Sequence, residues 1–220
     1  MDLREPEVLL AWQVVMARLE AHSHSDGLAA LLLKNYDAEP KSDEAGFVLE
    51  QAQSRLPMLV SSTRRIDISG AVGAALPLIE AGSGMTLFWG DFLTGYICGL
   101  KTSPLLDVDC MVFLSEFGKA IAAKSTRSDS AGQAWIGCTA HGDDLPWIRV
   151  VLEAIGYGSM TLSALLAKRA MNTGHTSGTD AMFGALLGSV LWRGCPYESE
   201  LVGRLCGSAA HLPQADELML

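Results

Sequence analysis

One spacing pattern, an aspartate followed by two glycines at four-residue intervals, occurs twice in this chain and constrains its fold more than any other feature. The copies are DFLTGYICG (91–99) and DAMFGALLG (180–188). Residues four apart lie on one face of a helix, so each copy predicts a helix with a strip of bare backbone below an aspartate in its first turn. Two such helices could cross closely and bring their starting ends together. The alternative is chance recurrence in a chain with 22 glycines.

Helical periodicity also dominates the rest of the chain. Apolar residues three and four apart predict an amphipathic helix over 5–21, with Pro6 in its first turn. Further helical patterns cover 27–33, 44–55, 69–80, 91–101, 105–124, 128–140, 145–155, 161–170, 178–192 and 198–206. Between them lie a strand-like run at 58–62, a polar surface loop at 36–44 and a frayed tail at 207–220. The sequence therefore predicts a mainly α, compact multi-helix single domain over residues 1–220.

Composition narrows the class of protein further. Hydrophobic residues make up 49% of the chain and charged residues 19%, which indicates a folded core rather than disorder. The net charge of −9 argues against nucleic acid as a partner, and an anionic ligand would have to be held by local geometry. The apolar segments 92–100 and 181–192 are too short to span a membrane.

Several smaller signals concern the compartment and the partners. The N-terminal MDLREPEVLL lacks a cleavable apolar stretch, which favours a cytoplasmic protein. Five cysteines without a C-x-x-C pair indicate buried, reduced thiols rather than a disulfide framework or a metal site. No cofactor fingerprint occurs either. Five tryptophans competing for burial suggest a further buried face between subunits, for which a homodimer is one arrangement.

Small and hydroxyl residues precede both glycine-patterned helices. Glycines allow close backbone approach to a ligand, and the free N–H groups of a helix start bind anions. The predicted ligand-binding residues are Gly82, Ser83, Gly84 and Thr86 in the first loop, and Gly174, Thr176, Ser177 and Gly178 in the second. His175 lies among these, which favours a functional role over a core position. The alternative is that the threonines only cap the helices and the glycines only make the turns.

Two stretches, LIEAGSGMTLFWGDFLTGYICGL (78–100) and GHTSGTDAMFGALLG (174–188), carry a family resemblance. They resemble the AllH-like subunit of oxamate carbamoyltransferase, with the patterns G-x-G-[LM]-T-P-[ST]-x-D-D-x-L-x-G and G-H-[ST]-S-G-x-D-x-L-x-G. The second pattern is matched by Gly174, His175, Thr176, Ser177, Gly178, Asp180 and Gly184. The first is matched by Gly82, Gly84, Met85, Thr86, Asp91, Leu93 and Gly95. The resemblance covers residues 5–193, the helical C-terminal portion of the family.

The first pattern also departs from the family. Leu87 replaces its proline, Phe88 its small hydroxyl residue, and Gly90 the first member of its acidic pair, which leaves Asp91 alone. These changes are compatible with an altered substrate, with loss of catalysis, or with a pocket closed over a different ligand.

The resemblance implies a subunit of a multi-component carbamoyltransferase, acting with FdrA-like subunits in purine and allantoin degradation. Such an enzyme moves a carbamoyl group between carbamoyl phosphate and the amide nitrogen of oxamate. On this hypothesis the loop hydroxyls hold the anionic ligand, and His175 donates to the carbonyl or relays a proton. Asp91 and Asp180 would orient that histidine or cap the loops. The alternatives are a non-catalytic assembly or regulatory subunit, and a small-metabolite binding domain.

Overall fold

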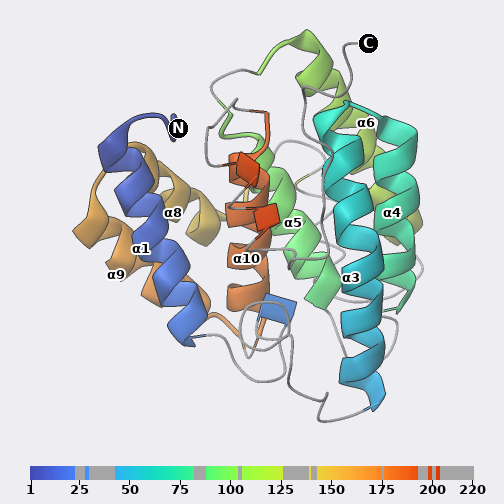
Figure 1. Cartoon of the computed structure of the whole chain (residues 1–220), viewed down its shortest axis with the longest axis horizontal. Helices are drawn as coiled ribbons and strands as arrows, with labels where there is room; N and C mark the ends of the chain where they lie inside the picture. Colours follow the sequence, from blue (N-terminus) through green and yellow to red (C-terminus); the bar gives the residue numbers. More distant parts are fainter. Residues whose placement is uncertain are drawn as a thin grey trace.

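The computed structural model contains a central pair of helices with three helices on each side (Figure 1). It describes residues 1–22, 28–29, 43–81, 88–103, 106–125, 139, 143–174, 176–192, 198–199 and 202–203. The central pair is α5 (Phe88–Leu100) and α10 (Ser177–Val190). One side holds α1 (Pro6–His22), α8 (Pro146–Gly156) and α9 (Met160–Met171), and the other holds α3 (Asp43–Arg64), α4 (Ile68–Ala81) and α6 (Val108–Ser125). The described part contains no strand, so the mainly helical prediction is confirmed.

Helix α10 is the centre of the core. Every residue from Gly178 to Val190 is buried, because the sequence of this helix is apolar or small around its whole circumference. Two buried aromatic residues, one on α1 and one on α5, donate hydrogen bonds to neighbouring hydroxyl groups. Trp12 Nε1 donates to Ser189 Oγ over 2.9 Å, and Tyr96 Oη donates to Thr63 Oγ1 over 2.8 Å. These bonds satisfy polar atoms that would otherwise destabilise the core.

The two glycine-patterned helices cross closely and run parallel. A Cβ on Gly95 would overlap the carbonyl of Ala181, and one on Gly184 would overlap the carbonyl of Phe92. One turn further along, Gly99 lies against Ala185 in the same way, and Gly188 against Tyr96. The matching order of these contacts along both helices gives the parallel direction. The close pairing predicted from the spacing is therefore confirmed.

Most of the predicted helices are present, with shifted ends. The largest error is at 58–62, which was expected to be strand-like but is the last part of α3. Pro57 lies inside this helix, and the buried Leu59 and Val60 continue its apolar face toward the core. Amphipathic burial thus decides the structure of this segment over its local β preference.

The C-terminal end of α10 was also predicted two residues too long. Leu191 is extended, and Trp192 adopts a φ of 59°. Outside the helix, Trp192 Nε1 donates to the carbonyl of Thr63 over 2.6 Å, and its ring packs edge-on against Phe113 at 5.3 Å. These two contacts hold Trp192 away from the helical path.

Several predicted segments lie wholly or mostly outside the described residues. These segments are the helices predicted at 27–33, 128–140 and 198–206, the loop at 36–44, and the tail at 207–220. Within the described part, no helix is long and apolar enough to cross a membrane.

Candidate functional site

The starts of α5 and α10 lie at the same end of the molecule, because the two helices are parallel. Each start carries one aspartate in its first turn, Asp91 in α5 and Asp180 in α10. Both side chains are buried, with Asp91 8% exposed and Asp180 fully enclosed. The charge of Asp91 raises the pKa of Asp180, so the two carboxyls are close enough to interact. The glycine crossing therefore produces an acidic pair at the predicted site.

Asp180 is the more perturbed member of this pair. Its Oδ1 accepts the backbone N–H of Ala29 over 3.0 Å, while its Oδ2 has no hydrogen-bond partner among the residues described. Burial raises the pKa of Asp180 to about 8, against the smaller lowering effect of the Ala29 N–H. The carboxyl therefore carries a proton at neutral pH, and Asp180 is a neutral hydrogen-bonding group there.

Asp91 connects the two helices. Burial raises the pKa of its carboxyl, and the hydroxyl of Ser177 at the start of α10 lowers it through a side-chain interaction. An acidic group in the first turn is also favoured by the positive end of its own helix. Asp91 thus positions the first residue of α10 against α5.

Three predicted ligand residues of the second loop have an identifiable structural setting. Gly174 has a φ of 67°, a left-handed conformation that favours glycine. Thr176 precedes α10 without a side-chain capping bond, and its hydroxyl is close enough to lower the pKa of Asp180. Gly178 lies against the backbone of Ala170 and Met171 at the end of α9, which leaves no room for a Cβ. Packing and turn geometry therefore account for both glycines.

The structure brings together Asp91, Asp180, Thr176 and Ser177 at one end of the central pair. The remaining predicted site residues lie outside the described residues; they are Gly82, Ser83, Gly84, Thr86 and His175. Chain connectivity attaches 82–87 to the start of α5 and His175 to the start of α10. In the described ranges, no group of three His, Cys, Asp or Glu side chains could hold a metal ion.

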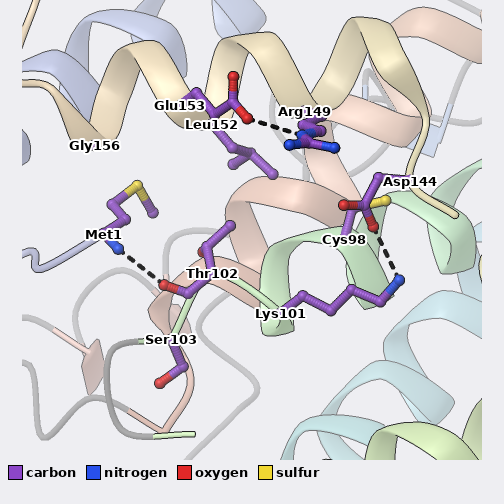
Figure 2. Close-up of a pocket in the computed structure, with 10 residues that line it drawn as sticks. All are labelled: Met1, Cys98, Lys101, Thr102, Ser103, Asp144, Arg149, Leu152, Glu153 and Gly156. Carbon is purple, nitrogen blue, oxygen red and sulfur yellow. Dashed lines mark hydrogen bonds and ion pairs between the residues drawn. The ribbon is translucent and has the colours of Figure 1, made fainter. Parts of the chain in front are cut away.

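A second polar cluster was not anticipated from the sequence. Lys101, Asp144, Arg149 and Glu153 line a cavity at the other end of α5 (Figure 2). The Arg149–Glu153 spacing of four residues on a predicted helix was a usable signal for one of these ion pairs. No sequence pattern indicated that Lys101 would contact Asp144, which lies 43 positions further along the chain.

No protein-family model, curated protein or solved structure matches this chain.

Proposed function

We propose that this chain is a subunit of a multi-component carbamoyltransferase of the oxamate type, located in the cytoplasm, which binds an anionic ligand where α5 and α10 begin. One observation carries the proposal. The parallel crossing places Asp91 and Asp180 together at the end where both glycine- and hydroxyl-rich loops enter their helices. Sequence segments 82–87 and 174–177 are thereby attached to the same end of the core, as a shared ligand site requires.

The electrostatics of this end are compatible with an anion despite the acidic residues. A protonated Asp180 adds no negative charge at neutral pH, and Asp91 is the one acidic group of the pair that is left to ionise. The N–H groups of two neighbouring helix starts favour phosphate and carboxylate ligands. In this mechanism the loop hydroxyls and N–H groups hold carbamoyl phosphate, and His175 donates to the carbamoyl carbonyl or relays the proton of the amide nitrogen. Asp91 and Asp180 act as positioning residues.

A second candidate function is a non-catalytic assembly or regulatory subunit. The observation that favours it is that both aspartates already have structural partners, Ser177 for Asp91 and the N–H of Ala29 for Asp180. Large apolar side chains also remain exposed on α6 and α9, including Met111 at 62% and Leu165 at 64%. Burial of such side chains against FdrA-like subunits or a second copy of the chain would stabilise an assembly.

Thermal unfolding with carbamoyl phosphate, phosphate, oxamate and oxalurate tests ligand binding. A ligand at a hundred times its Kd stabilises the folded state by about 2.7 kcal/mol, which raises Tm by roughly 5 to 10 °C for a chain of this size. The rise in Tm should disappear in His175→Ala. It should persist in His141→Ala, which is the matched control because His141 belongs to neither motif. No rise with any of the four compounds would contradict the ligand site.

Catalysis needs a separate measurement. Oxalurate phosphorolysis by the chain together with its partner subunits should be lost in His175→Ala. Unchanged turnover in that variant, with ligand binding intact, would favour the assembly or regulatory role.

A further inference from the structure

The cavity at the carboxyl end of α5 is a separate candidate site. It has a volume of about 510 Å³, within the range of small-molecule pockets, and lies between residues 98–103 and one face of α8. Asp91 and Lys101 are ten residues apart on this helical path, which corresponds to roughly 15 Å along the axis. The cavity is therefore distinct from the start of the central helix pair.

Two ion pairs line this cavity. Lys101 Nζ lies 2.9 Å from Asp144 Oδ1 and also donates to the carbonyl of Thr139 over 3.2 Å. Arg149 Nε donates to Glu153 Oε1 over 2.8 Å, both side chains project from α8, and Asp144 lies close enough for its charge to raise the pKa of Arg149 (Figure 2). Lys101 and Asp144 are each about three-quarters buried, at 24% and 26% exposure, so this pair is held in place.

The Arg149–Glu153 ion pair leaves hydrogen-bonding capacity unused. The guanidinium of Arg149 donates through Nε, and neither of its Nη groups has an acceptor in the part of the chain that is described. Those Nη groups form the planar fork that binds a carboxylate through two parallel hydrogen bonds. Glu153 uses Oε1 for Arg149, which leaves Oε2 as an acceptor four residues along the same helix face. A carboxylate-binding group and an ammonium-binding group therefore lie side by side.

The unused groups point to the class of ligand. The side chains on the walls carry two cations, Lys101 and Arg149, and two anions, Asp144 and Glu153, and the ammonium group of Met1, which also lines the cavity, donates to the carbonyl of Thr102 over 3.0 Å. A ligand carrying one charge of each sign can meet the unused Nη groups and the unused Oε2 at once, without adding net charge to the site. Leu152, three residues after Arg149 and next to Glu153 in the sequence, adds an apolar wall.

We propose that this cavity binds a small zwitterionic metabolite of the α-amino-acid class. Its carboxylate lies against the Nη groups of Arg149 with Lys101 nearby, and its ammonium group donates to Glu153 Oε2. Its side chain packs toward Leu152. This site does not depend on the carbamoyltransferase proposal, because it uses none of the residues at the helix starts.

Isothermal titration calorimetry of the full chain with the common L-amino acids tests the proposal. At least one amino acid should bind, while acetate and methylamine, which each carry half of the zwitterion, should not. Arg149→Gln and Glu153→Gln should each weaken binding roughly tenfold or more, the contribution expected of a hydrogen bond to a charged group. Lys119→Gln is the matched control, because Lys119 and Glu116 form a similarly exposed ion pair on α6, at 61% and 51% exposure against 63% and 49% for Arg149 and Glu153.

Three outcomes would overturn the proposal: no binding of any amino acid, equally tight binding of acetate alone, or unchanged affinity in both Arg149→Gln and Glu153→Gln. His175→Ala should leave amino-acid binding unchanged, and Arg149→Gln should leave the thermal response to carbamoyl phosphate unchanged. Failure at one site is thereby distinguishable from failure at the other.

Discussion

Gly184 of α10 lies directly against the carbonyl group of Phe92 in α5, with no space between them for a Cβ atom. The same relationship recurs along the pair, so the central crossing depends on glycine at each contact. This geometry makes the cost of a single added methyl group measurable.

Gly184→Ala should lower the free energy of unfolding by about 1 to 3 kcal/mol or more, since the backbones must separate to admit the methyl group. Gly73→Ala is the control, because a Cβ there meets nothing within 4 Å and α4 should gain about 1 kcal/mol from better helix propensity. Urea unfolding of both variants measures the difference. Equal effects of the two substitutions would contradict the close crossing.

Ser189→Ala should destabilise the protein by about 1 to 3 kcal/mol, because it leaves the buried Trp12 Nε1–H without its acceptor. Ser163→Ala provides a matched comparison on α9. Its buried hydroxyl lacks a hydrogen-bond partner in the described portion, so its removal should be neutral or stabilising by up to about 1 kcal/mol. Chemical denaturation measures both, and a larger loss at Ser163 than at Ser189 would refute this assignment.

Asp180→Asn should change the pH dependence of stability. The folded state holds the proton of Asp180 up to a pKa of about 8, while the unfolded state releases it near pH 4. The contribution of Asp180 to the wild-type free energy of unfolding therefore falls as the pH rises from about 4 to about 8. The fall is at most about 1.4 kcal/mol per pH unit.

The asparagine variant lacks this loss, because it never ionises. The free energy of unfolding of the variant minus that of the wild type should therefore rise steadily from pH 5 to pH 8. Above that range the difference should stay constant. Urea midpoints at several pH values provide the measurement. Parallel curves for the two proteins would show that Asp180 is ionised in the folded state.

Cys98 and Cys110 should resist alkylation in the native protein. Both are buried free thiols, and burial raises the pKa of each to about 11. At pH 8 the thiolate fraction is then about one thousandth, and the thiolate is the reactive form. Mass spectrometry after iodoacetamide treatment should find these two positions modified in urea and unmodified without it. Rapid native labelling at Cys98 would contradict its enclosure against Asp144.

The helical class and the central helix pair were predictable because both depend on local periodicity. Spacings of three and four residues place apolar groups on one face of α1, and the glycine spacing predicts a close crossing of two helices, in which the structure shows Gly95 against Ala181. The strand-like run at 58–62 was misread because β preference is a local property, whereas the burial of Leu59 is a tertiary one.

Long-range polar contacts account for most of what the sequence did not predict. The Asp180 contact with the N–H of Ala29 spans 151 residues, and the Lys101 contact with Asp144 spans 43. No periodicity links such positions, so the acidic pair could be predicted from matched helix starts while its binding partners could not. The perturbed pKa of Asp180 likewise follows from burial, which depends on the whole fold.

The parallel direction of α5 and α10 has a consequence for synthesis on the ribosome. Residues 101–176 separate the end of one helix from the start of the other, so α5 emerges long before the helix that covers its glycine strip. At translation rates of about 5 to 20 residues per second, this delay lasts roughly 4 to 15 seconds. For that interval the nascent chain carries an apolar helix without its partner, and a chaperone that shields residues 88–100 would raise the yield of native protein.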